Sequence, residues 1–142
     1  MARLATVGLM ACAGCHVALT SLTNKLVEIL KNVDLVHSYI LMDEKEIPDN
    51  IDVGIVEGGV KTSHDEKVVQ ELREKSRMLI AFGDCACFGG LPSLINIYDL
   101  DSAFKAAYIE NPSTVNGFRP VSYTHLRAHE TSLHLVCRLL LE

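Results

Sequence analysis

The sequence predicts an α/β fold, a doubly wound parallel sheet with helices on both faces. Two observations predict it. Short apolar runs that are typical of strands alternate with segments whose apolar residues recur at helical spacing. Strands that alternate with helices along a chain form parallel sheets through right-handed crossover connections. The 142 residues, 49% of them hydrophobic, are enough for one domain with its own core.

The first half of the chain supplies three of the expected strands. Residues 2–11 are small and apolar and predict the first strand, 34–42 the second and 51–56 the third. The polar connection 43–50, which contains Pro48, separates the last two and shows no convincing helical pattern. Between the first two strands, apolar residues at steps of two to four predict one helix: Val17, Leu19, Leu22, Leu26, Ile29 and Leu30.

The second half supplies the fourth strand and two further helices. Ser63 and Glu66 have the spacing of a capping box, which predicts that a helix begins there. Residues 77–82 predict the fourth strand, and Gly83 ends it. A last helix is predicted over residues 99–108. The buried face of the first of these helices is expected to consist of Val68, Val69 and Leu72.

Composition excludes several classes of function. Charged residues make up 22% of the chain and the net charge is −5, so no basic surface for nucleic acid is expected. No apolar stretch approaches the ~20 residues that span a bilayer, and no signal peptide is expected. Five cysteines without a secretory signal favour metal binding or redox chemistry over disulfides. We therefore expect a cytoplasmic protein without a membrane span.

Two cysteine pairs carry the strongest chemical signal. Cys12 and Cys15 follow the first predicted strand, and Cys85 and Cys87 follow the fourth. Loops that leave the carboxyl ends of parallel strands meet at one edge of the sheet, where open α/β sheets bind their ligands. The four thiols can therefore converge, and the pattern predicts a metal cluster. Spacing alone does not decide which of Cys85 and Cys87 would reach the metal.

The residues around these cysteines are small. Ala13, Gly14 and Ala86 let backbone N–H groups approach a cluster closely, as thiolates bound to iron require. The C-x-x-C spacing also occurs in thioredoxin-type redox pairs, in half-sites for zinc and between buried thiols. Two alternatives therefore stay open. One is a structural zinc site closed by all four cysteines, and the other is a thiol oxidoreductase that uses the C-x-x-C pair.

Three motifs occur in order along the chain. Residues 12–16 read Cys-Ala-Gly-Cys-His, residues 56–60 read Val-Glu-Gly-Gly-Val, and residues 83–93 read Gly-Asp-Cys-Ala-Cys-Phe-Gly-Gly-Leu-Pro-Ser. Together they resemble the small subunit of nickel-iron hydrogenases, in particular the soluble type of methyl viologen-reducing or deazaflavin-reducing enzymes. A more distant resemblance is to the 20 kDa subunit of NADH:ubiquinone oxidoreductase. The resemblance covers roughly residues 1–119.

The resemblance implies a flavodoxin-like domain that holds the proximal 4Fe-4S cluster of such an enzyme. Carried over by motif, Cys12, Cys15 and Cys85 correspond to cluster ligands, whereas Cys87 would lie next to the cluster without binding it. Glu57 directly follows an apolar strand, so it is either a solvated residue at the strand end or a group beside the cluster at the subunit contact. The cluster would pass electrons between the nickel-iron centre of a hydrogenase large subunit and an acceptor, and catalysis would belong to that partner. Further iron-sulfur or flavin electron-transfer subunits are implied as additional partners.

The C-terminal part departs from the family pattern. The family's fourth cluster ligand lies in a Gly-Cys-Pro motif, which this chain lacks, and Cys137 has neither glycine nor proline beside it. Residues 122–131 resemble the translated read-through of a sequencing adapter. We therefore expect a truncated iron-sulfur domain of residues 1–119, followed by a foreign tail, 120–142, that does not pack as a fifth strand.

Overall fold

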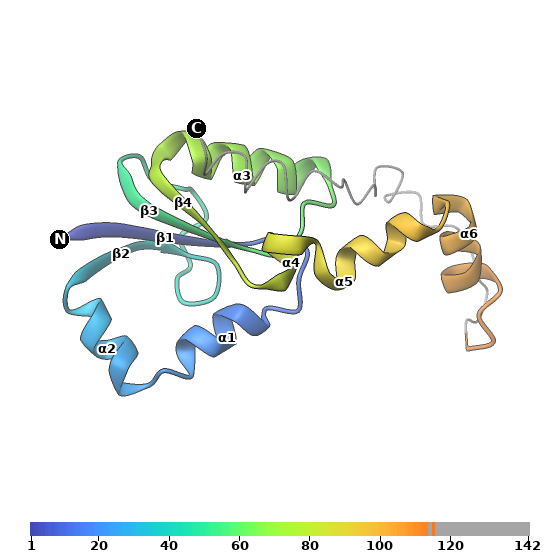
Figure 1. Cartoon of the computed structure of the whole chain (residues 1–142), viewed down its shortest axis with the longest axis horizontal. Helices are drawn as coiled ribbons and strands as arrows, with labels where there is room; N and C mark the ends of the chain where they lie inside the picture. Colours follow the sequence, from blue (N-terminus) through green and yellow to red (C-terminus); the bar gives the residue numbers. More distant parts are fainter. Residues whose placement is uncertain (114, 116–142) are drawn as a thin grey trace.

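The computed structural model describes residues 1–113 and 115 (Figure 1). Its centre is a four-stranded sheet in the order β2-β1-β3-β4, in which all neighbouring strands are parallel. The predicted α/β class with a doubly wound, four-stranded parallel sheet is confirmed. The strands are β1 (Ala2–Gly8), β2 (Val33–Ser38), β3 (Ile51–Glu57) and β4 (Ser76–Phe82).

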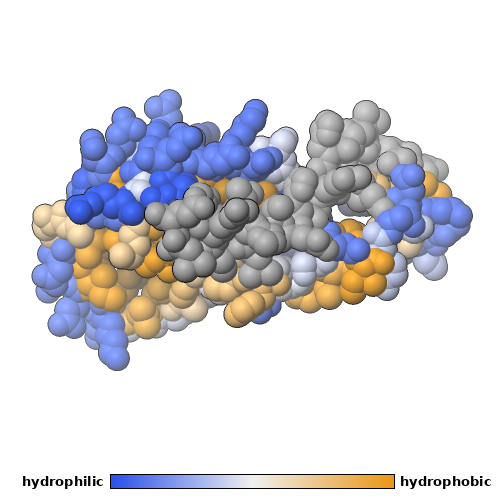
Figure 2. Space-filling model, turned by 45° about the horizontal axis from the view of Figure 1, so that its top comes forward, coloured by the Kyte–Doolittle hydropathy of each residue, from blue (hydrophilic) through white to orange (hydrophobic). Residues whose placement is uncertain are grey.

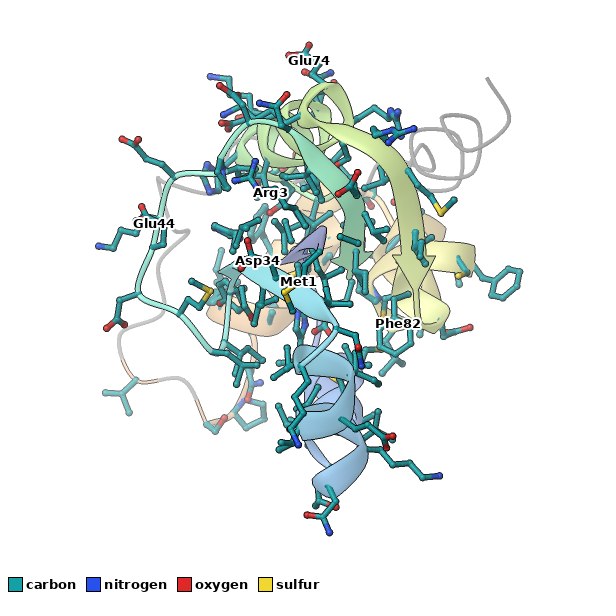
Figure 3. All side chains as sticks on the ribbon, turned by 90° about the vertical axis from the view of Figure 1, so that its left-hand side faces the viewer. Met1, Arg3, Asp34, Glu44, Glu74 and Phe82 are labelled. Carbon is teal, nitrogen blue, oxygen red and sulfur yellow. The ribbon has the colours of Figure 1, made fainter. Side chains whose placement is uncertain are left out.

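The helices lie on both faces of this sheet. One face is covered by α3 (Ser63–Lys75), and the other by α1 (Gly14–Thr20) and α2 (Asn24–Leu30) (Figures 1 and 3). No described helix is both long and apolar enough to cross a membrane. After β4 the chain continues through short helices that extend beyond the sheet: α4 (Asp84–Phe88), α5 (Gly90–Ser93), η1 (Leu94–Ile97), α6 (Leu100–Phe104) and η2 (Lys105–Ile109).

The main core lies between the sheet and α3. Val69 and Leu72 of this helix are buried as predicted, whereas Val68 is only half-buried. Full burial of an aliphatic side chain of this size contributes about 1.5–3 kcal/mol to stability. The strands contribute the remaining sheet residues of this cluster, namely Ala5, Val7, Ile51, Val56 and Leu79.

The cap of α3 differs by one residue from the predicted one. The helix begins at Ser63, but the capping residue is Thr62. The Thr62 hydroxyl accepts a hydrogen bond from the Asp65 N–H at 3.2 Å, and the Asp65 carboxylate accepts one from the Thr62 N–H at 2.8 Å. The predicted pair of Ser63 and Glu66 is therefore wrong, because the neighbouring pair satisfies the same spacing. The Asp65 carboxylate thus occupies the N-terminus of α3.

The predicted single helix after the first strand is also wrong. It is divided into α1 and α2 by a turn at residues 21–23, where Thr23 has a φ of 48°. The hydroxyls of Thr20 and Ser21 donate to the Val17 carbonyl at 2.9 and 2.7 Å, and such side-chain bonds offer the backbone an alternative to the helix. None of the side chains of α2 is buried.

Strand ends fix where the loops begin, and several predicted boundaries are wrong. β1 ends at Gly8 rather than at residue 11, because Leu9 donates to the Glu57 carbonyl at 2.9 Å and Met10 forms an antiparallel bridge with Gly59. β2 ends at Ser38 rather than at residue 42, and residues 39–50 contain no helix, as predicted.

Further along the chain, α4, α5 and η1 were not predicted, and the predicted helix 99–108 is α6 followed by the π-helical turn η2. The predicted boundary at residue 119, the tail 120–142 and Cys137 lie outside the described residues, so those expectations stay predictions.

Candidate metal centre

Both cysteine loops lie at the carboxyl edge of the sheet. Cys12 and Cys15 follow β1, and Cys85 and Cys87 lie in α4, directly after β4. β3 runs between these two strands, and the loop after it is joined to the first cysteine loop by the bridge described above. The topology therefore brings together thiols that are far apart in the sequence.

Glycine backbone lies against three of the four sulfurs. A Cβ atom on Gly83 or Gly90 would collide with a cysteine Sγ, and one on Gly14 would crowd it, so the absence of a side chain permits the close approach. The Cβ position of Gly83 overlaps the Cys15 Sγ outright. The corresponding distances are 2.9 Å for Gly90 and Cys85, and 3.1 Å for Gly14 and Cys12.

Gly83 is the most constrained of these positions. Its φ of 90° and ψ of 168° belong to a region that is essentially restricted to glycine, and the Cys15 sulfur fills the space of its missing side chain. Backbone that approaches sulfur so closely suits thiolates bound to iron, whose potentials depend on hydrogen bonds to sulfur. The residues present therefore fit an iron-sulfur cluster.

The thiol of Cys15 is half-buried beside other acidic groups. Burial raises its pKa above the ordinary value, and the Glu57 carboxylate and the other three thiols, Cys85, Cys12 and Cys87, raise it further. The thiol is therefore protonated at neutral pH in the metal-free chain. A reactive redox cysteine requires the opposite shift of the pKa, so Cys15 is not suited to be the attacking thiol of a thiol oxidoreductase.

Cys85 and Cys87 point in different directions because α4 is helical. Residues two apart in an α-helix are separated by roughly 200° around its axis. The Cys87 Sγ lies 3.5 Å from the Ala81 carbonyl oxygen and donates a weak hydrogen bond back to β4. The Cys85 Sγ lies instead against Gly90. The structure thus distinguishes two thiols that the sequence spacing left equivalent.

Glu57 is buried at the end of β3 with 1% of its surface exposed. Its Oε2 accepts a hydrogen bond from the His16 backbone N–H at 2.7 Å and lies 2.7 Å from the His16 Nδ1. A buried carboxylate requires such partners, and the contact fixes the first turn of α1, and with it Cys15, to the end of β3. Sequence reasoning singled out Glu57 but missed this pairing, because the two residues are 41 positions apart.

Exposed apolar side chains surround the cysteine edge. Phe88 and Leu91, which follow the second cysteine loop, are 70% and 79% exposed, and Val17, after the first loop, is 55% exposed. Hydrophobic residues gather along the lower side of the molecule in Figure 2, away from the hydrophilic surface over α3. Sequence reasoning missed Phe88 and Leu91, because only the fold shows that they do not enter a core. Grouped apolar exposure of this kind marks interaction surfaces.

The family of this chain follows from comparison with known proteins. A family model described as NADH ubiquinone oxidoreductase, 20 Kd subunit, matches residues 12–124. The chain belongs to this family. The matched segment includes both cysteine loops and Glu57, and it extends past the predicted domain boundary at residue 119.

Curated relatives are hydrogenase subunits. A vhu subunit of the F420-non-reducing hydrogenase of Methanocaldococcus jannaschii is 41% identical over 118 residues, which are 83% of this chain and 41% of the relative. An iron-sulfur subunit of the F420-non-reducing hydrogenase of Archaeoglobus profundus is 35% identical over 112 residues, 74% of this chain and 35% of the relative. The chain therefore spans less than half the length of these two relatives.

The structure of this chain also matches a solved hydrogenase structure. The NAD+-reducing NiFe hydrogenase in its H2-reduced state matches with a TM-score of 0.76 and 26% identity, over 84% of this chain and 66% of that chain. The resemblance to nickel-iron hydrogenase subunits that the three motifs predicted is confirmed.

Proposed function

We propose that this chain is the electron-transfer subunit of a nickel-iron hydrogenase. In this role it holds the proximal 4Fe-4S cluster through Cys12, Cys15 and Cys85, with a fourth cysteine C-terminal to the described residues. When bound, the cluster supplies one-electron transfer between the nickel-iron centre of the large subunit and an acceptor. The observation that carries the proposal is the meeting of two cysteine loops at one sheet edge, with glycine backbone against three sulfurs.

Protons have to leave the site when its thiols bind iron. Because burial and neighbouring acidic groups raise the pKa of Cys15, this thiol does not ionise by itself near neutral pH. The positive charge of iron compensates the thiolates, so cluster binding and deprotonation occur together.

Glu57 places a buried negative charge beside the site without binding iron. Its influence on the pKa of Cys15 and its bond to the His16 N–H support this position. A fixed negative charge disfavours the addition of an electron, so Glu57 would lower the reduction potential of the cluster. His16 would hold the carboxylate in place and keep α1 against β3.

Iron and sulfide analysis tests this proposal. After anaerobic reconstitution of the full 142-residue chain with a small thiol present to complete the coordination, we expect equal amounts of bound iron and sulfide and a brown protein. Uptake of zinc alone, in a colourless protein, would contradict the proposal and favour the structural zinc site. Among the described residues, no group of three or more His, Cys, Asp or Glu side chains is already arranged to hold a metal ion, so the metal content has to be measured for both alternatives.

The hydrogenase large subunit is the partner we propose at the cysteine edge, with further iron-sulfur or flavin subunits completing a cytoplasmic assembly. A cluster that exchanges electrons with the partner's metal has to lie close to that partner. The exposed side chains of Phe88 and Leu91 next to Cys85 support this surface, because fully buried centres of interfaces are apolar.

Replacing Leu91 by serine should weaken this assembly without affecting the fold. Leu91 is 79% exposed in the isolated chain, so the substitution removes few contacts within the chain and mainly those made with a partner. We expect the yield of co-purified large subunit to fall about fivefold or more, as for an interface anchor. The matched control is Ile29→Ser on α2, which lies toward the left end of the molecule in Figure 1, away from α5, and this 44% exposed residue should leave the yield unchanged. Equal losses in both variants would exclude this surface.

A further inference from the structure

A cavity of about 560 Å³ lies on the α3 side of the sheet, beside β1 and β2. Its origin is topological. The connection from β2 to β3 crosses over β1, and a helix usually covers the sheet in such a crossover. Residues 39–50 contain no helix here, so the loop spans the strands and leaves space beneath it. The volume is in the usual range of ligand pockets.

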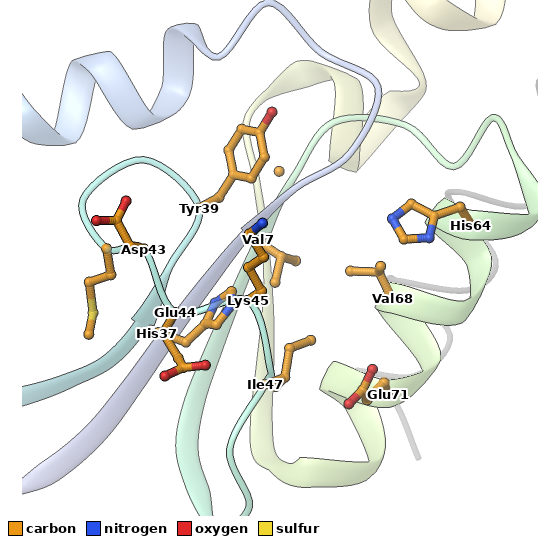
Figure 4. Close-up of a pocket in the computed structure, with 12 residues that line it drawn as sticks. Val7, His37, Tyr39, Asp43, Glu44, Lys45, Ile47, His64, Val68 and Glu71 are labelled. Atoms are coloured by element: carbon orange, nitrogen blue, oxygen red, sulfur yellow. The ribbon is translucent and has the colours of Figure 1, made fainter.

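Residues of β1, of β2, of the loop after β2 and of α3 line this cavity. Figure 4 shows side chains of α3 facing the strands and the loop across it. His64, Val68 and Glu71 are three and four positions apart on this helix, so they share one face. Val7 and Ile47 provide the apolar floor. The end of β2 and the loop after it contribute His37, Tyr39, Asp43, Glu44 and Lys45.

The charges of the lining residues favour a cation. Asp43, Glu44 and Glu71 carry negative charge, and Lys45 is the single lysine or arginine among the described lining residues. Lys75, outside the cavity, donates to Glu71 at 2.7 Å and compensates its charge, so Asp43 and Glu44 supply the negative charge, which the exposed Lys45 of the same loop only partly balances. Anionic ligands are disfavoured further because Asp65 already occupies the N-terminus of α3.

A buried histidine adds a hydrogen-bond acceptor. His37 is 6% exposed, and its Nδ1 lies 3.1 Å from the carbonyl oxygen of Thr6. Since a carbonyl oxygen can only accept, Nδ1 carries the hydrogen, and Nε2 of the neutral ring is an acceptor. His37 and the carboxylates of the lining are therefore suited to a ligand that donates hydrogen bonds. The Tyr39 ring provides an aromatic wall on which a flat cation can rest.

We propose that this cavity binds a small organic cation, an ammonium or amidinium group on a flat apolar body. The site is separate from the cysteine loops, although Tyr39 connects the two regions: its ring centroid lies 6.5 Å from that of His16, which contacts Glu57. Binding at the cavity requires no cluster, so a failure of this inference and a failure of the proposed electron-transfer role can be told apart.

Titration of the full chain with benzamidine, followed by NMR of backbone amides, tests the inference. We expect saturable shifts of the Tyr39, Ile47 and Val68 amides with a Kd of about 1 mM or tighter, as for a small ligand with few contacts. Benzoate, which has the same shape and the opposite charge, should cause no such shifts.

Charge variants provide the matched controls. The double substitution Asp43→Asn with Glu44→Gln should weaken benzamidine binding about tenfold and leave the dispersion of the spectrum unchanged, because both residues are exposed. Glu74→Gln alters a charge on the outer side of α3, away from the loop, and should leave the Kd unchanged (Figure 3). Equal binding of benzoate, undiminished binding by the double variant, equal weakening by Glu74→Gln, or no saturable shifts would each overturn the inference.

Discussion

Replacing Cys85 by serine should remove most of the reconstituted cluster, whereas Cys87→Ser should retain it. Cys85 lies against the glycine backbone of Gly90 and is the iron ligand that we propose from this loop, and a serine hydroxyl is a poor substitute for a thiolate. The Cys87 thiol instead donates to the Ala81 carbonyl, a bond that a serine hydroxyl can also form.

The measurement is iron and sulfide content together with the paramagnetic resonance spectrum of the reduced protein. We expect cluster content to fall about tenfold or more for Cys85→Ser, a loss at least as large as those seen for groups that only support a metal ligand. The spectrum of Cys87→Ser should stay close to that of the unsubstituted chain. The reverse pattern would show that Cys87 is the ligand and that the ligand cysteine of the family motif corresponds to Cys87 rather than to Cys85.

Gly83→Ala should both destabilise the fold and prevent cluster binding. The new Cβ atom would overlap the Cys15 Sγ, and the backbone at this position adopts a conformation that is essentially restricted to glycine. Strain of this kind costs about 1–3 kcal/mol, and displacement of the sulfur adds to it. Thermal unfolding of the metal-free chain should therefore occur at a Tm about 5 °C lower or more.

Gly59→Ala is the matched control for this substitution. Gly59 lies in the neighbouring loop after β3, and a Cβ atom there would meet no atom closer than 3.5 Å. We expect this variant to retain its Tm within about 2 °C and to take up iron and sulfide normally. If both variants behaved alike, the close approach of Gly83 to Cys15 would not be a requirement of the site.

Much of the fold could be predicted because strands of a parallel sheet are apolar over most of their length. All four strands and the helix at Ser63 were found from such runs and from spacing. The division into α1 and α2 could not be predicted, because it depends on how the hydroxyls of Thr20 and Ser21 compete with the helix. Likewise, η1 and α5 are too short to show a periodic pattern.

Residue type and order were enough to predict the fold class, to single out the two cysteine loops and, through three ordered motifs, to recognise the family. These properties follow from patterns within short segments of the chain. Three features of the site could be seen only in the tertiary structure. They are the close approach of glycine backbone to particular thiols, the contact of Glu57 with His16, and the hydrogen bond of Cys87 to Ala81. The same is true of the cavity that a helix-free crossover leaves beside β1. The approach of Gly83 to Cys15, the contact of Glu57 with His16 and the cavity arise where segments distant along the chain meet in space, and local sequence patterns do not encode such distances. The turn of Cys87 toward Ala81 is local, but it depends on the helical course of α4, which was not predicted.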